Sequence, residues 1–99
     1  MSYALKSEKM QRFQFEINEN GYLILPQIIA TEYFSEDACV TLLRDPELWV
    51  LPVRGANSGG LLLKQRNASG DRSVLVHEVF PLDFPIGFFQ GFWDEENHA

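Results

Sequence analysis

Few side chains in this 99-residue chain could perform nucleophilic or acid–base chemistry. The chain has one cysteine, Cys39, and two histidines, His77 and His98. Cys39 and His77 could form a nucleophile and its base, but no local signature of such a pair surrounds them. His77 and Glu78 are adjacent in an extended segment and therefore point to opposite faces of a strand. We interpret Cys39 as a small buried apolar side chain and predict no catalytic residue.

Motifs for metals and cofactors are also missing. One cysteine and two separated histidines provide no pair with the spacing of a zinc site. The glycine-rich segment 54–60 lacks the Gly-Lys-Ser/Thr ending of a phosphate-binding loop, and it precedes a predicted strand instead of a helix. We therefore predict that the protein is not an enzyme and that it holds no metal and no cofactor.

A group of cations offers one kind of binding chemistry. Lys64 and Arg66 share one face of a predicted strand, because they are two residues apart. With their neighbours they form a basic group that suits an anion or an acidic partner: Arg54, Lys64, Arg66 and Arg72. The alternative is that these cations keep an outer strand soluble and prevent edge pairing.

An aromatic group near the C-terminus offers another kind of binding chemistry. It runs into the acidic residues 94–96, and no Lys or Arg follows Arg72. Rigid rings dominate the energetics of protein interfaces, so we predict that five of them bind a partner: Phe84, Phe88, Phe89, Phe92 and Trp93. The alternative is that these rings complete the core of this chain or of a homodimer.

The hydrophobic pattern predicts the elements that must position these groups. Alternation over 13–17, a turn at Asn20-Gly21 and an apolar run over 22–25 indicate a β-hairpin. Pro26 can open a short helix over 26–34. Further strands are predicted over 38–42, 48–53, 61–66 and 73–79. The fold class is therefore mainly β with one short helix, a small antiparallel barrel or sandwich built from hairpins that can also exchange strands in a dimer.

Length and charge limit the organisation and the partners. The length suits one domain, which we divide into a mobile arm over 1–12, a β-rich domain over 13–80 and an aromatic, acidic segment over 81–99. A net charge of −6 argues against coating nucleic acid or a membrane by bulk electrostatics. The single cysteine and the absence of a long apolar run predict a cytoplasmic protein without membrane association.

Residues 13–53 resemble a known family in their order. A strand ending at Gly21-Tyr22-Leu23-Ile24-Leu25-Pro26 leads into a short helix, a further strand and a return strand that ends in Leu51-Pro52. This order resembles the swapped-hairpin family of AbrB-like transition regulators, antitoxins and MraZ proteins. The resemblance implies a strand-swapped dimer in which basic residues near the glycine and on the helix contact DNA. Here the helix carries Gln27, Thr31 and Glu32 instead, so DNA binding is disfavoured.

A second resemblance covers residues 59–76. The strings Gly59-Gly60-Leu61-Leu62-Leu63-Lys64-Gln65-Arg66-Asn67 and Gly70-Asp71-Arg72-Ser73-Val74-Leu75-Val76 resemble small accessory proteins of nickel-iron hydrogenase maturation. This resemblance implies a maturation role without supplying a metal site.

Together these features predict a small cytoplasmic, non-catalytic interaction protein. As an accessory or antitoxin-like factor it would dock a protein partner through its aromatic segment and its basic strand face, and we expect a homodimer. One alternative is a swapped-hairpin DNA-binding transcription regulator whose basic arm (Lys6, Lys9 and Arg12) reaches phosphates. Another is a hydrogenase maturation accessory protein.

Overall fold

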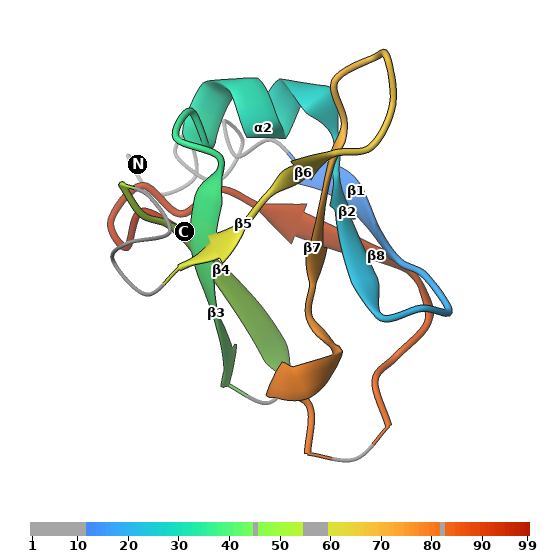
Figure 1. Ribbon diagram of the computed structural model, residues 1–99. Coiled ribbons are helices and arrows are strands. Elements are labelled where there is room, and N and C mark those ends of the chain that lie inside the picture. Colours follow the sequence, from blue (N-terminus) through green and yellow to red (C-terminus); the bar gives the residue numbers. More distant parts are fainter. Residues whose placement is uncertain (1–11, 45, 55–59, 82) are drawn as a thin grey trace.

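The computed structural model describes residues 12–44, 46–54, 60–81 and 83–99 (Figure 1). Of the predicted basic arm only Arg12 lies within these ranges, so Lys6 and Lys9 are outside the described residues. Most of the glycine-rich segment 54–60 is also outside them. Within the described part of the chain, no helix is long and apolar enough to cross a membrane.

Two antiparallel sheets and one short helix make up the fold, which confirms the predicted mainly β class (Figure 1). The elements are β1 (Arg12–Ile17), β2 (Tyr22–Leu25), α2 (Gln27–Tyr33), β3 (Ala38–Arg44), β4 (Glu47–Pro52), β5 (Leu61–Leu62), β6 (Lys64–Gln65), β7 (Arg72–Leu75), the 3-10 turn η2 (His77–Val79) and β8 (Gly87–Phe92). The strand orders are β6-β7-β2-β1-β8 and β4-β3-β5. The sheets do not close into a barrel.

One short segment belongs to both sheets. β5 pairs with β3, β6 pairs with β7, and only Leu63 separates the two. The sheets are therefore continuous at this corner. At the other end of each strand order lie β4 and β8, and neither has a second strand neighbour within the described ranges. The molecule is a two-layered structure that is joined along one side and open along the other.

Asp37 fixes the corner where the sheets meet. Its backbone carbonyl accepts a 2.8 Å hydrogen bond from the N–H of Leu63, and its carboxylate forms a 3.0 Å ion pair with the Nε of Arg72 on β7. Its φ of 53° is in the left-handed region, which aspartate tolerates better than most residues. One residue therefore connects the start of β3, the β5–β6 segment and β7.

The first hairpin forms as the sequence predicts. The register pairs Ile17 with Leu23, and both side chains are buried in the core. The Asn18 side chain accepts hydrogen bonds from the backbone N–H groups of Asn20 and Tyr22, which closes the turn. Gly21 follows with a φ of 83°, and its carbonyl accepts the N–H of Val76 at 2.9 Å. The glycine thus joins the turn to the end of β7.

The core lies between the sheets and under α2. It consists of Ile17, Leu23, Leu25, Ile29, Phe34, Cys39, Leu63, Val74 and Val76. The predicted helix is confirmed, with Ile29 and Ala30 as its buried residues. The strand predicted over 73–79 ends earlier, at Leu75. The chain turns there because Val76, bonded to the carbonyl of Gly21, adopts helical backbone angles and leads into η2.

Strand β8 is an element that the sequence analysis did not predict. It pairs with the whole length of β1, with Phe15 opposite Phe89 and Phe13 opposite Gly91. A Cβ at Gly91 would lie 2.5 Å from the Phe15 ring, so this ring packs over a position without a side chain. The two glycines of β8 interrupt the apolar alternation by which a strand is recognised.

We predict that Gly21→Ala lowers the free energy of unfolding by more than about 1 kcal/mol. The added Cβ would occupy a left-handed backbone position and lie 2.7 Å from the Cβ of His77. Gly87→Ala is the control, because Gly87 also has a positive φ (134°) but nothing within 4 Å of an added Cβ. Urea unfolding followed by circular dichroism should show the larger loss for Gly21→Ala. Equal losses would mean that the His77 contact contributes nothing.

Candidate functional site

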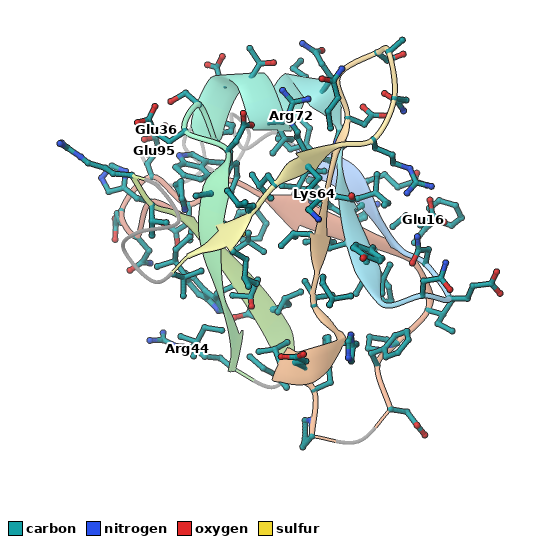
Figure 2. The ribbon with its side chains drawn as sticks, viewed as in Figure 1. Glu16, Glu36, Arg44, Lys64, Arg72 and Glu95 are labelled. Atoms are coloured by element: carbon teal, nitrogen blue, oxygen red, sulfur yellow. The ribbon has the colours of Figure 1, made fainter. Side chains whose placement is uncertain are left out.

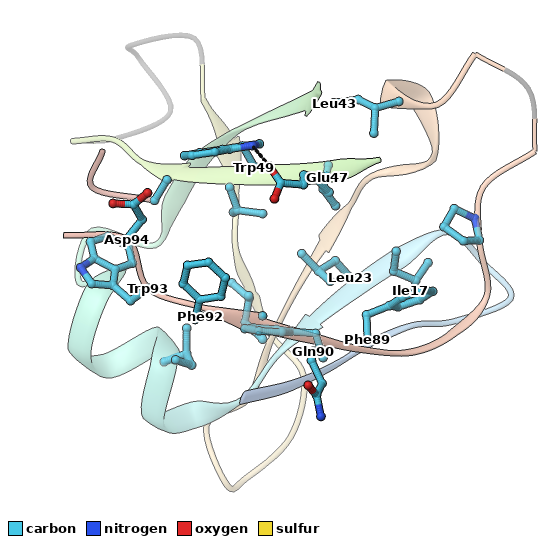
Figure 3. A pocket seen from close by; sticks show the side chains of 18 of the residues that line it. Ile17, Leu23, Leu43, Glu47, Trp49, Phe89, Gln90, Phe92, Trp93 and Asp94 are labelled. Carbon is cyan, nitrogen blue, oxygen red and sulfur yellow. Dashed lines mark hydrogen bonds between the residues drawn. The ribbon is translucent and has the colours of Figure 1, made fainter. Parts of the chain in front are cut away.

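An apolar groove of about 460 Å³ lies between the two sheets on the open side of the fold (Figure 3). Its floor includes core side chains such as Ile17 and Leu23. One wall comes from the β3–β4 hairpin, with Leu48, Trp49 and Val50, and the other comes from β8, with Phe89, Gly91 and Phe92. The groove therefore extends down to the buried core.

The register of the β3–β4 hairpin explains the first wall. Leu48 pairs with Leu43 and Val50 with Thr41, so these side chains share one face of the hairpin, and Leu43, Leu48 and Val50 line the groove from it. Trp49 stands at the rim. Its indole N–H donates a 3.2 Å hydrogen bond to Glu47, and the Arg44 guanidinium lies 5.3 Å from its ring centroid. These contacts hold the ring in place beside the groove.

Strand β8 supplies the second wall and three of the predicted partner-binding residues. Phe89 and Phe92 line the groove and are 39% and 48% exposed. Phe88, which is 66% exposed, does not line it. Phe88 and Phe89 point to opposite faces because they are consecutive residues of one strand. Phe89 therefore faces the groove and Phe88 the outer face of the sheet, while Phe92, the last residue of β8, also lines the groove.

The other two predicted partner-binding rings are partly buried and pack against the core. Trp93 stacks on Tyr33 of α2 with ring centroids 4.1 Å apart, and it is T-shaped to Phe34 with ring centroids 6.2 Å apart. Phe84 packs against the core and lies 6.2 Å from the His77 ring. Trp93 anchors the end of β8 to the helix and also lines the groove at that end. The C-terminal rings thus serve the fold and the groove together.

Among the described residues, two charged side chains line the groove, and both are acidic. Glu47 lies at one wall and Asp94 follows β8 (Figure 3). The Asp94 carboxylate accepts hydrogen bonds from the backbone N–H groups of Glu96 and Asn97. A pair of backbone hydrogen bonds between Asp94 and Ala99 closes this turn. The ordered turn places negative charge at the mouth of an apolar groove.

The predicted basic group does not converge on the groove. Lys64 and Arg66 are exposed on and beside β6, which is the opposite edge of the five-stranded sheet from β8. Arg72 is engaged within the fold, because it pairs with Asp37 and donates a 2.7 Å hydrogen bond to the carbonyl of Gly70 (Figure 2). Arg54 is exposed after β4. The four cations therefore form no single surface with the aromatic residues.

Asp71 joins the turn before β7 to the helix. Its carboxylate accepts the side-chain N–H of Asn67 at 3.0 Å and the backbone N–H of Gln27 at 2.8 Å. Both hydrogen bonds lower the pKa of the Asp71 carboxyl, and the one from Asn67 has the larger effect. Gln27 is the first residue of α2, so Asp71 supplies from a distant hairpin the acceptor that a local N-cap residue normally provides.

Cys39 is fully buried, and burial raises the pKa of its thiol to about 11. The thiol is therefore protonated near neutral pH, as expected for a core side chain. His77 is exposed on η2. Within the described ranges, no three His, Cys, Asp or Glu side chains converge in a way that could hold a metal ion.

Sequence reasoning found the β8 side of the groove and missed the β4 side. The signal for β4 was the continuous apolar run 48–53, which is typical of a strand with apolar residues on both faces. By itself, this run predicts only the returning strand of a hairpin. That its inner face borders a groove depends on the distance between the two sheets, which no local pattern encodes.

Comparison of the chain with protein-family models, with curated proteins and with solved structures finds no match. The resemblances to swapped-hairpin proteins and to hydrogenase maturation accessory proteins stay predictions. The function is therefore inferred from the groove and from the residues that form it.

We predict that Asp71→Asn lowers thermal stability at neutral pH and that the difference from the wild type shrinks in acid. The lowered pKa of Asp71 means that its ionised form stabilises the folded state. This contribution is complete above the ordinary carboxyl pKa and is lost as the pH falls through the lowered folded value. Thermal denaturation of both proteins across the acidic range would test this. A difference that is independent of pH would contradict the assigned role of the charge.

Proposed function

We propose that this protein is a small, non-catalytic interaction protein that docks a protein partner in the groove between β4 and β8. The observation that carries the proposal is an apolar groove with aromatic walls, open to water, in a chain with few residues to spare for a core. Small soluble proteins rarely leave large apolar patches uncovered unless a partner uses them. The volume of the groove is in the range of ligand-binding sites.

The chemistry of the lining favours binding over catalysis. Most of the lining is apolar, and its two carboxylates, on Glu47 and Asp94, already accept hydrogen bonds from neighbouring groups. The buried Cys39 thiol is protonated and is not among the groove residues. Aromatic residues with a polar rim are instead the composition of a protein interface.

The groove alone is sufficient for docking in this proposal. The basic residues Lys64 and Arg66 lie at the other edge of the five-stranded sheet, so they would contact the same partner only if it reached around that sheet. An accessory role and an antitoxin-like role both fit this proposal, because they differ in the identity of the partner and not in the docking surface.

We predict that Phe89→Ser removes the partner while Phe88→Ser retains it. The two residues are neighbours of the same type on one strand, but only Phe89 lines the groove. Tagged wild-type and variant proteins would be used to capture partners from native-host extract at low salt, with nuclease treatment and mass spectrometry. The supporting result is one stoichiometric protein that survives nuclease and is lost only with Phe89→Ser.

Thermal denaturation of the three proteins provides the stability control, since Phe89 also lies opposite Phe15 in the sheet. Equal recovery of the protein with both variants would place docking outside the groove. Recovery of nucleic acid alone would favour the DNA-binding alternative.

A further inference from the structure

The β3–β4 hairpin has a second apolar face, which is turned away from the groove. The cross-strand pairs of β3 and β4 alternate between the two faces, and the outer one carries Val40 opposite Leu51 and Leu42 opposite Trp49. Leu62 of β5 adds to the same side of β3. We call these five residues the outer sheet face.

The outer sheet face is exposed to water. Val40, Leu42 and Leu62 are 37%, 42% and 57% exposed, and Trp49 and Leu51 are partly exposed. An antiparallel sheet that meets water on one side normally has polar residues there. Strands that are apolar on both faces are instead typical of a sheet that is covered on both sides. The pattern therefore indicates that a further layer packs on this face.

We propose that the further layer is a second copy of this chain, so that two copies pack face to face through the outer sheet face and form a symmetric dimer. Of the five residues of this face, Trp49 alone also lines the groove. The inference therefore goes beyond the proposed function and does not rest on it.

Opposite charges lie side by side at one end of the outer sheet face. Arg44 at the end of β3 is directly opposite Glu47 at the start of β4, and both are exposed (Figure 2). Trp49 holds both side chains, because Arg44 lies over its ring and Glu47 accepts its indole N–H. A guanidinium has five N–H donors and a carboxylate has two acceptor oxygens, so each group can bind a further partner beyond Trp49.

This arrangement of charge is complementary to itself. In a symmetric dimer the same surface meets its own copy. A two-fold axis that runs along the strands, midway between β3 and β4, places β3 of one copy over β4 of the other. Arg44 of each copy then faces Glu47 of the other copy, and Leu42 faces Trp49. Packed sheets keep their strands within about 30° of each other, which is compatible with this alignment.

A partner of another kind fits this face less well. The end of the face carries one cation and one anion, so an acidic segment would meet the like charge of Glu47 and a basic segment that of Arg44. Like charges across an interface reduce affinity. A second copy supplies both opposite charges at the required spacing, together with an apolar surface of the same shape.

The size of the face predicts the strength of the dimer. Its exposed side chains, with Arg44 and Glu47, offer roughly 500 Å² per copy, or on the order of 1,000 Å² for the pair, which is near the lower limit of specific interfaces. Obligate dimers bury about 2,000 Å² or more. We therefore expect a reversible equilibrium between monomer and dimer, with a dissociation constant of about 1–100 µM.

The experiment is sedimentation equilibrium of the full chain across this range of concentration. The wild type should change from monomer to dimer, and Leu42→Glu should weaken the dimer at least about tenfold, because it places two like charges near the axis. Ile28→Glu is the matched control and should leave the dimer unchanged. Ile28 is an equally aliphatic residue, 57% exposed on α2, and the substitution adds the same charge away from the face.

Circular dichroism checks that the variants fold. Leu62→Glu provides the same test at the most exposed of the three aliphatic positions, if Leu42→Glu does not fold. Wild-type protein that remains a monomer at every concentration would overturn the proposal. Equal weakening by Leu42→Glu and Ile28→Glu would overturn the assignment to this face.

A mixing experiment tests the symmetry. Arg44→Glu and Glu47→Arg should each weaken the dimer about tenfold, because like charges then face each other twice. An equimolar mixture of the two variants should recover the dimer, since in a mixed pair every introduced charge faces its opposite. If the two residues act only within one chain, through Trp49, mixing recovers nothing, and the proposed axis is wrong.

One further outcome separates this inference from the proposed function. A dimer that dissociates with Phe89→Ser and not with Leu42→Glu would place the second copy in the groove and overturn the proposal. Partner capture by the Leu42→Glu variant tests docking in the groove independently of the dimer, so either conclusion can fail while the other holds.

Discussion

The corner at Asp37 is the constraint on which the rest of the structure depends. The carbonyl of Asp37 binds the N–H of Leu63, and its carboxylate binds Arg72, so β3, the β5–β6 segment and β7 meet at one residue. Because the sheets are joined there, they diverge toward the opposite side, where no strand of the described residues lies between β4 and β8. The groove is therefore a consequence of how the sheets are joined and not a local indentation.

The C-terminal segment contributes aromatic rings both to the core and to the groove. Trp93 stacks on Tyr33 and fixes β8 against the helix, while Phe89 and Phe92 remain partly exposed in the groove. Pairing of β8 with the whole of β1 makes the segment part of the larger sheet. The two interpretations that the sequence left open, a core role and a docking role, are thus compatible, because different rings of the same segment face different surroundings.

The sequence predicted those elements whose signals are local. The Asn20-Gly21 turn and the alternation over 13–17 specify the first hairpin, and Pro26 marks the start of the helix. It did not predict β8, because Gly87 and Gly91 interrupt the apolar alternation of that strand. Only the fold shows why position 91 is a glycine, since the Phe15 ring packs over it. It also grouped Arg72 with Lys64 and Arg66. Only the fold shows that Arg72 pairs with Asp37, since that partner is distant in the sequence.

The groove floor and the core are formed by the same side chains, which links docking to stability. Ile17 and Leu23 belong to the buried cluster and also line the groove. A segment bound there would cover apolar surface that the small chain cannot cover itself. A partner that binds only the folded state stabilises it by mass action. Docking in the groove, as proposed above, would therefore also stabilise the fold.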